Sequence, residues 1–535
     1  MKLALAQTNP VVGDFAGNVA RIREMSRRAA AAGAQLVVFP ELSICGYMPR
    51  DLLEEPSFLD ACGRALDEIA ADRDAPARLV GCPLRAEGPG KPLVNAAVLV
   101  RGGERIVTAK RLLPTYDVFD ERRYFRPGGE ADLVRFGGTL LGVTICEDMW
   151  TGEHGQGLYE GDPVADLVEA GAHLVVNLSA SPYARGKPAA RRRIVEEHAR
   201  RHQVPFAFVN MAGGSDQLSF DGNSFAVAGG GRLVAHGAAW GEDLVVTDMS
   251  RAARPPADGD DVGKALVLGI RDYFLKTGFA DALVGLSGGV DSALTACLAV
   301  DALGKEHVTG VSMPGPFSAP ISEEDARALA TSLGIRFHVV PITAQYERMR
   351  EALRGVWGEQ PFGVAEENLQ ARLRGVVLMA LANRQRALVL ATSNKSEFAM
   401  GYATLYGDMV GALAPLTDLY KTEVYELAKR YPIPERTVTR APTAELRPNQ
   451  TDQDSLPPYE VLDGILRLHL EERLRPAEIV EQGYDAATVH RVLKAVSLAE
   501  YKRQQSSPVL KVTGKAFGLG GRRFPIVERF FGGAG

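Results

Sequence analysis

The stretch Ala282-Leu283-Val284-Gly285-Leu286-Ser287-Gly288-Gly289-Val290-Asp291-Ser292 decides the fold of the second half of the chain. It is an apolar run that breaks into a glycine-rich turn. Beyond the turn, apolar residues recur at helical spacing from Ala293 to Leu298. The sequence therefore predicts a strand, a tight loop and the N-terminus of a helix.

The residue types in this loop indicate phosphate binding. Gly288 and Gly289 let the backbone approach an anion without a Cβ clash, and the first N–H groups of the helix point at it. Ser287 and Ser292 add hydroxyl donors. Phosphates would repel Asp291 unless a cation lay between them, which favours a magnesium-bound nucleotide. A glycine-rich turn without a ligand is the alternative interpretation.

The loop lacks both the Gly-x-x-x-x-Gly-Lys pattern of P-loop NTPases and the Gly-x-Gly-x-x-Gly pattern of dinucleotide folds. It resembles the Ser-Gly-Gly-x-Asp-Ser loop of the ATP pyrophosphatase (PP-loop) family. That family cleaves ATP between the α and β phosphorus atoms to adenylate a substrate. The resemblance implies that ATP contacts Gly285, Leu286, Ser287, Gly288, Gly289, Val290, Asp291 and Ser292.

Composition indicates a soluble globular protein of several domains. A chain of 535 residues predicts two to four domains, and 46% hydrophobic with 24% charged residues is typical of globular proteins. The formal net charge of -5 gives no electrostatic reason to expect a nucleic-acid partner. Glu196 and Glu197 interrupt the one basic run, at 185–201, so we expect a solvated helix face there.

The cysteine pattern and the N-terminus indicate a cytoplasmic protein. The five cysteines show no paired spacing, and no cluster of cysteines and histidines has the spacing of zinc ligands. The chain opens directly as a strand at Lys2–Ala6 rather than as a signal peptide. No apolar run reaches membrane-spanning length, so we expect no membrane partner.

Residues 1–250 alternate apolar strands with helices, which predicts an α/β domain with a large mixed sheet. The predicted strands are Leu3–Gln7, Gln35–Phe39, Arg78–Gly81, Ala96–Val100, Leu140–Ile145, His173–Asn177 and Pro205–Asn210. A stretch rich in proline and aspartate follows, which can hold neither a helix nor a central strand. We therefore expect domains at 1–250 and 262–535, joined by a linker at 251–261.

The second domain is expected to contain a doubly wound parallel sheet. Continuous apolar strands at Val308–Met313, Phe337–Ile342 and Ala387–Thr392 are separated by helices near 322–333 and 366–385. In such sheets ligands bind beyond the carboxyl ends of the strands.

Three strand ends in the first half carry reactive side chains. Glu41 follows an apolar strand, Lys110 lies in an otherwise apolar, turn-like segment, and Cys146 ends another strand. Taken singly, each has an ordinary interpretation, since a buried cysteine usually packs as a small hydrophobe. Together they resemble the Glu-Lys-Cys triad of the nitrilase (carbon-nitrogen hydrolase) family, which implies an αββα sandwich.

The implied chemistry is amide hydrolysis. Cys146 would be the nucleophile, Glu41 the general base and Lys110 the group that stabilises the oxyanion. The segments at 113–125 and 177–187 resemble the glutamine-hydrolysing branch of that family. By that resemblance, glutamine contacts Tyr116, Ser181 and Lys187.

Four ordered segments of the second half, at 366–372, 391–397, 406–409 and 415–422, resemble NAD synthetases. With its nitrilase-like half, nearly the whole chain resembles the glutamine-hydrolysing members of that family. Lys511 competes with Lys502 for a contact with the dinucleotide. The implied ligand sets are Thr392 and Lys421 for ATP, Asp291 and Glu397 for Mg²⁺, and Asn368, Arg372, Glu397, Asp408 and Lys502 for deamido-NAD.

The resemblance implies that ATP-dependent amidation converts deamido-NAD to NAD through an adenylated intermediate. Ammonia would come from L-glutamine, and the other products would be AMP, pyrophosphate and glutamate. Because ammonia is nucleophilic only while unprotonated, a dry channel between the two sites is a hypothesis. The resemblance also implies a homo-oligomer. The alternatives are another glutamine-dependent amide ligase and an amidase fused to a nucleotide-binding sensor.

Overall fold

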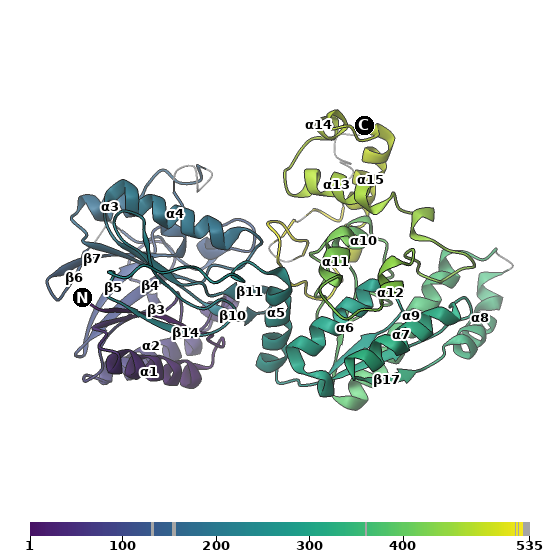
Figure 1. Ribbon diagram of the computed structural model, residues 1–535, viewed down its shortest axis with the longest axis horizontal. Coiled ribbons are helices and arrows are strands. Elements are labelled where there is room, and N and C mark those ends of the chain that lie inside the picture. The colour runs from purple at the N-terminus through teal and green to yellow at the C-terminus, as the bar shows by residue number, and fades with distance from the viewer. Residues whose placement is uncertain (130–132, 152–156, 359–360, 519–520, 523, 528–535) are drawn as a thin grey trace. The chain divides into compact units, whose positions relative to one another are not determined.

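The computed structural model describes residues 1–535 except 130–132, 152–156, 359–360, 519–520, 523 and 528–535. The chain divides into two compact units, Met1–Ala265 and Leu266–Gly535 (Figure 1). The division falls near the start of α5 (Val262–Thr277), which directly follows the expected linker.

The first unit contains two six-stranded sheets. One has the order β14-β1-β2-β3-β4-β5, with β1, β2 and β3 parallel and the remaining pairs antiparallel. Its strands are β1 (Leu3–Gln7), β2 (Leu36–Val38), β3 (Ala77–Arg85), β4 (Leu93–Arg101), β5 (Glu104–Ala109) and β14 (Asp243–Thr247).

The other sheet has the order β13-β12-β9-β8-β7-β6, with β7, β8 and β9 parallel. A separate hairpin pairs β10 (Ala212–Ser215) with β11 (Leu218–Asp221). The strands of the second sheet are β6 (Leu133–Phe136), β7 (Thr139–Ile145), β8 (Leu174–Ser179), β9 (Phe206–Asn210), β12 (Phe225–Val227) and β13 (Leu233–His236).

The two sheets pack face to face, and helices cover their outer faces. One buried cluster joins apolar residues of both sheets, such as Leu5 and Leu79 of the first with Val143 and Val176 of the second. In Figure 1, α1 and α2 lie on one side of the sheets, and α3 and α4 lie on the other. The helices are α1 (Phe15–Ala31), α2 (Pro56–Ala71), α3 (Pro163–Glu169) and α4 (Lys187–His202).

This arrangement confirms the αββα sandwich implied by the family resemblance. The expectation of a single large mixed sheet is wrong. The reason is that several strands that complete the two sheets are short or half-exposed, so their apolar pattern is too weak to predict them from the sequence. β5, for example, is exposed over Glu104–Val107, although it leads directly to Lys110.

Helix α4 also corrects the expectation of a purely solvated basic face. Arg191 is buried, and its guanidinium makes hydrogen bonds of 2.6 and 2.5 Å to the buried carboxylate of Asp221. His198 is buried on the same helix. The remaining basic side chains of the run include exposed ones such as Arg193.

The second unit is built on a four-stranded parallel sheet of order β17-β16-β15-β18. Since β16 and β18 flank β15 on opposite sides, the chain reverses its winding between β15 and β18. Open α/β sheets bind ligands at such a switch point. The strands are β15 (Ala282–Gly285), β16 (Val308–Ser312), β17 (Arg336–Val339) and β18 (Leu388–Leu390).

Four long helices pack around this sheet, as the doubly wound expectation requires. α6 (Val290–Leu303) and α7 (Pro320–Leu333) contact β16, and α9 (Val364–Gln385) contacts β15 and β18. α8 (Thr343–Trp357) packs against α9.

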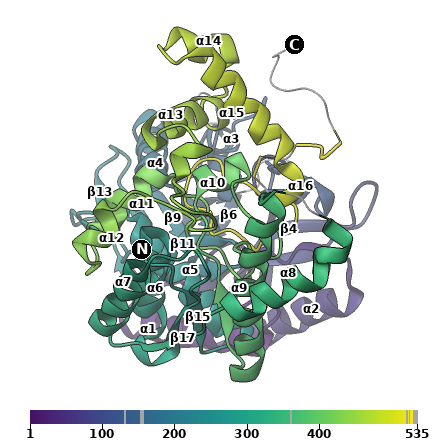
Figure 2. The same cartoon turned by 90° about the vertical axis from the view of Figure 1, so that its right-hand side faces the viewer.

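Among the described residues, seven shorter or peripheral helices complete the second unit, and Figure 2 shows α13, α14 and α15 gathered beyond the sheet. No helix in the described parts of the chain is both long and apolar enough to cross a membrane. The seven are α10 (Lys395–Met400), α11 (Lys421–Ala428), α12 (Glu435–Thr439), α13 (Tyr459–Leu470), α14 (Pro476–Glu481), α15 (Ala486–Leu498) and α16 (Glu500–Arg503).

Candidate functional sites

Glu41, Lys110 and Cys146 all lie in the interior of the first unit. Glu41 follows β2, Lys110 follows β5, and Cys146 follows β7. The side chains of Glu41 and Lys110 are fully buried, and Lys110 Nζ lies 2.8 Å from Glu41 Oε1. Cys146, which follows a strand of the other sheet, is buried near enough for the charges of Glu41 and Lys110 to act on its thiol, so residues from both sheets meet at one buried site.

The backbone and a neighbouring amide fix the carboxylate of Glu41. Asn95 Nδ2 donates a 2.7 Å hydrogen bond to Oε1, and the N–H of Ala180 donates a 3.0 Å hydrogen bond to Oε2. Both oxygens are thus oriented before any substrate binds. A carboxylate held in one orientation, as that of Glu41 is, suits a general base, because the base must stay aligned with the group whose proton it accepts.

A second carboxylate, Glu121, completes the site. Its Oε1 lies 2.7 Å from Lys110 Nζ, so the lysine bridges two acids. Burial raises the pKa of Glu121 to about 7, although Lys110 opposes the shift. Burial disfavours the charged form of Lys110, yet Glu121 and Glu41 outweigh it and raise its pKa above the usual value. Lys110 is therefore an ammonium at neutral pH.

Cys146 occupies a strained backbone position at the start of η3 (Cys146–Met149). Its φ is +44°, a left-handed conformation that is uncommon for a side chain with a Cβ. Asn177 Nδ2 donates a 3.4 Å hydrogen bond to its carbonyl oxygen. Burial, and next the charge of Glu41, raise the pKa of the Cys146 thiol. The Cys146 side chain is therefore a thiol at rest, and it would need a base to act as a nucleophile.

The three candidate glutamine-binding residues have different surroundings. The hydroxyl of Tyr116 donates to both carboxylate oxygens of Glu147, at 2.8 and 3.0 Å, and Glu147 directly follows Cys146. Lys187 begins α4, with Nζ 5.9 Å from the Trp150 ring. Ser181 is buried, and its N–H donates a 2.8 Å hydrogen bond to an asparagine side chain.

A cavity of about 280 Å³ lies at the carboxyl ends of β15 and β18 in the second unit, at the switch point. Four of the residues expected to bind ATP or deamido-NAD are absent from the described part of the cavity lining: Gly288, Asn368, Arg372 and Lys502. Those that do line it are Gly285, Leu286, Ser287, Gly289, Val290, Asp291, Ser292, Thr392, Glu397, Asp408 and Lys421.

The glycine-rich loop has a well-defined internal structure. The hydroxyls of Ser287 and Ser292 lie 3.2 Å apart, and the N–H of Gly289 donates a 3.3 Å hydrogen bond to Ser287 Oγ. Gly288 has φ +79°, and a Cβ there would lie 2.5 Å from the carbonyl oxygen of Ser322. The close approach of the Ser322 backbone therefore requires glycine at position 288, whether or not a ligand is bound.

Lys421 joins the two carboxylates expected to hold a metal ion. Its Nζ forms an ion pair with Asp291 and lies 3.1 Å from Glu397 Oε1. The hydroxyl of Tyr459 lies 3.2 Å from Glu397 and donates a 2.7 Å hydrogen bond to Asp452. Burial raises the pKa of Glu397 to about 7 and also raises the pKa of Asp452.

The residues expected to bind deamido-NAD gather at the segment 401–408. Thr404 connects two of them, since its hydroxyl donates to Asn368 Oδ1 at 2.7 Å and its N–H to Asp408 Oδ1 at 2.6 Å. Lys502 Nζ donates to two carbonyl oxygens of this segment, both at 2.7 Å. Arg372 Nε donates to a third at 3.2 Å.

Comparisons with known proteins cover both units. A family model for carbon-nitrogen hydrolases matches residues 2–255, and one for NAD synthases matches residues 262–506. The glutamine-dependent NAD(+) synthetase of Synechocystis sp. is 44% identical over 551 residues, which cover 99% of each chain. The chain belongs to the glutamine-dependent NAD(+) synthetase family. The Thermotoga maritima member is 40% identical over 582 residues, again 99% of each chain.

Solved structures agree with this assignment. The glutamine-dependent NAD(+) synthetase of Acinetobacter baumannii, solved in complex with ADP, is 37% identical with a TM-score of 0.77, and the match covers 98% of each chain. The enzyme from Cytophaga hutchinsonii has a TM-score of 0.85 at 23% identity, covering 99% of this chain and 98% of that one. The latter likeness concerns the fold alone.

The donor set around Lys421 fits a magnesium ion in this NAD(+) synthetase family member. Three carboxylates, those of Asp291, Glu397 and Asp452, lie around the ammonium of Lys421. Burial is the main cause of the raised pKa values of Glu397 and Asp452, and the negative charge of Asp291 adds to both shifts. Carboxylate oxygens are the ligands that a hard divalent cation prefers.

The sequence pattern of this NAD(+) synthetase family member did not identify two residues of these sites, Glu121 and Asp452. Glu121 lies in a charged run, beside Asp120 and Arg122, where spacing does not single it out. Asp452 lies in a polar, proline-containing stretch that reads as a mobile loop, yet it is buried and lines the cavity. The only sequence signal for Glu121 was its place within the segment that resembles the glutamine-hydrolysing branch.

Proposed function

We propose that this chain amidates deamido-NAD to NAD, with ATP and Mg²⁺, using ammonia that its first unit releases from L-glutamine. The observation that carries the proposal is the presence in one chain of two complete sites. One is the buried set of Glu41, Lys110 and Cys146, and the other is the phosphate-type loop with the carboxylates bridged by Lys421.

In the first unit, Glu41 would take the proton of the Cys146 thiol, and the thiolate would attack the carboxamide carbon of glutamine. Two of the three N–H donors of Lys110 already face Glu41 and Glu121. The third would stabilise the oxyanion of the tetrahedral intermediate. Glu41 would return the proton to the departing ammonia, and water would then release glutamate from the thioester.

In the second unit, the loop at 285–292 and the N-terminus of α6 would hold the phosphates of ATP. The nicotinate carboxylate of deamido-NAD would attack the α-phosphorus, and ammonia would then displace AMP. Asp291 and Glu397 would hold Mg²⁺, and the bound ion would neutralise charge on the departing pyrophosphate. Thr392 and Lys421 would contact ATP from the opposite side of the switch point.

Deamido-NAD would lie along the segment 401–408. Asn368, Glu397 and Asp408 offer it hydrogen-bonding groups, while Arg372 and Lys502 hold the backbone of that segment in place. The family resemblance also supports a homo-oligomer. Light scattering on the purified protein tests that part of the proposal, since a mass of 57.5 kDa in solution would contradict it.

Isotope transfer tests the function. The purified chain is incubated with ATP, Mg²⁺, deamido-NAD and glutamine labelled with ¹⁵N in the amide. The masses and amounts of the products are measured by mass spectrometry. The proposal predicts NAD that carries the label, in equal amount to AMP and glutamate. AMP formation that does not depend on deamido-NAD, or its complete absence, would contradict the assignment and favour another ligase or a fused sensor.

A further inference from the structure

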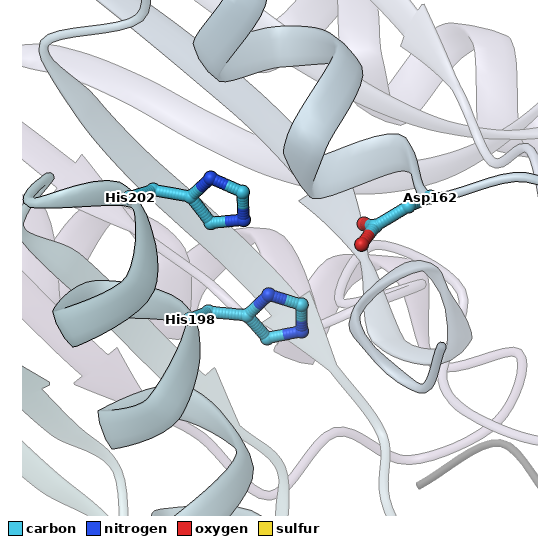
Figure 3. A group of neighbouring side chains, drawn as sticks. All are labelled: Asp162, His198 and His202. Carbon is cyan, nitrogen blue, oxygen red and sulfur yellow. The ribbon is translucent and has the colours of Figure 1, made fainter. Parts of the chain in front are cut away.

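A cluster of three side chains in the first unit lies outside the site of Cys146. His198 and His202 lie four residues apart on α4, so they share one face of the helix. Figure 3 shows their rings one above the other, with the carboxylate of Asp162 facing them. One potential metal-binding atom from each residue lies within 4.8 Å of the other two.

The protonation of His198 is set by its neighbour. Its Nε2 lies 2.9 Å from the carbonyl oxygen of Met149. A carbonyl oxygen can only accept a hydrogen bond, so Nε2 carries a proton and Nδ1 carries the lone pair of the neutral ring. Metal-binding histidines commonly donate their other N–H to a backbone carbonyl in this way.

The other two residues complete an N/O donor set. His202 Nε2 is buried and has no hydrogen-bond partner among the described residues. One oxygen of the Asp162 carboxylate caps the start of α3, because Oδ1 accepts the N–H groups of Val164 and Ala165, each at 3.1 Å. Stacked packing alone explains the parallel rings, but it leaves His202 Nε2 without a hydrogen-bond partner in the part of the chain that the structure describes.

We propose that Asp162, His198 and His202 bind a divalent transition-metal ion, specifically Zn²⁺, which ties the start of α3 to the end of α4. Two imidazoles and one carboxylate are a donor set that suits zinc, with water as the fourth ligand. Ligand atoms about 2.1 Å from a tetrahedral ion lie about 3.4 Å apart, so modest rotation of the half-buried Asp162 and His202 side chains closes the set.

The site would also support the nucleophile segment. His198 contacts Met149, the last residue of the η3 turn that begins with Cys146. An ion on Nδ1 of this ring would fix the orientation of the ring and, through Nε2, the end of that turn. The site differs in ligand type from the all-oxygen magnesium set of Asp291 and Glu397. No zinc motif stands out in the sequence, because Asp162 is remote from the histidine pair.

A zinc titration of the full chain tests the proposal. The protein is stripped with a chelator, and Zn²⁺ is added in competition with a chromophoric chelator. We expect one equivalent of Zn²⁺ to bind, with at least tenfold weaker affinity in His202→Gln and in Asp162→Asn. Asparagine keeps the helix cap while it removes the charged ligand. His490→Gln, a change of an exposed histidine on α15, is the control and should bind as the wild type does.

Two further measurements keep the test independent of folding. We expect Zn²⁺ to raise the thermal unfolding midpoint of the wild type but not that of His202→Gln, although the two proteins unfold at similar temperatures without metal. Co²⁺ in place of Zn²⁺ should give the strong visible bands of a four-coordinate ion, and His202→Gln should lose them. The absence of a tight one-equivalent site, or equal affinity in wild type and both variants, would overturn the proposal.

Discussion

Replacing Glu121 with glutamine should impair glutamine hydrolysis selectively. Glu121 accepts a 2.7 Å hydrogen bond from the Lys110 ammonium, and both side chains are buried. Glutamine keeps the shape of the side chain but removes its charge. A hydrogen bond to a charged group contributes about 1.5–3 kcal/mol, so we expect a fall of about 10- to 150-fold in the rate of glutamate release.

The pH profile gives a second signature of the same change. Burial raises the pKa of Glu121 to about 7, so this carboxyl is largely protonated below that pH. The activity that depends on its charge should therefore rise as the pH increases through about 7. Glu121→Gln removes the titrating group, so its profile should lack that limb.

The assay measures glutamate released from glutamine and, in the same preparation, AMP formed with ammonium as the nitrogen donor. Glu104→Gln is the matched control, because Glu104 is an exposed residue of β5, the strand that leads to Lys110. Ammonium-supported AMP formation should stay within about twofold in both variants. Unchanged glutamate release and an unchanged pH profile in Glu121→Gln would refute the reasoning.

Three further substitutions test other parts of the structure. Gly288→Ala places a Cβ 2.5 Å from a backbone oxygen at φ +79°, so pyrophosphate release should fall at least tenfold while circular dichroism stays native. Lys421→Met removes the ammonium that bridges two carboxylates, and ATP-dependent AMP formation should fall about 100-fold or more; activity within threefold of the wild type would contradict its role. Arg191→Met strands the buried Asp221 carboxylate, so urea unfolding should show a loss of about 3–5 kcal/mol, against less than about 0.5 kcal/mol for the exposed Arg193→Met.

The sequence predicted well those elements whose local pattern and tertiary role agree. β1 was expected at Leu3–Gln7 and lies there, because every residue of this strand is buried between layers. The strand, loop and helix around Ser287–Ser292 also follow directly from an apolar run, two glycines and a helical apolar pattern. Continuous burial leaves a strong signal in the residue types.

Half-exposed elements were harder to predict. β5 and β14 complete the edges of the first sheet, but β5 is largely exposed and β14 only partly buried, so their apolar runs are no longer than three residues. The division of the first unit into two sheets depends on pairings between strands far apart in sequence, such as β1 with β14. Local patterns carry no information about such pairings, and only the family resemblance implied the sandwich.

The candidate sites show the same contrast. Glu41, Lys110 and Cys146 stand out because each is a reactive residue beside a strand, and the structure brings Lys110 within hydrogen-bonding distance of Glu41. Glu121 and Asp452 owe their importance to burial beside an ammonium or another carboxylate, which depends on distant parts of the chain. Their sequence surroundings are those of ordinary polar loops.

If the two sites of this chain serve a single overall reaction, replacing Cys146 with alanine should remove one nitrogen source and spare the other. NAD formation from deamido-NAD, ATP and Mg²⁺ is measured with either glutamine or ammonium as the nitrogen donor. We expect the rate of glutamine-supported NAD synthesis to fall at least 1,000-fold in the variant. The rate of ammonium-supported synthesis should stay within a few-fold of the wild-type rate. Glutamine-supported NAD formation that persists in Cys146→Ala would contradict this expectation.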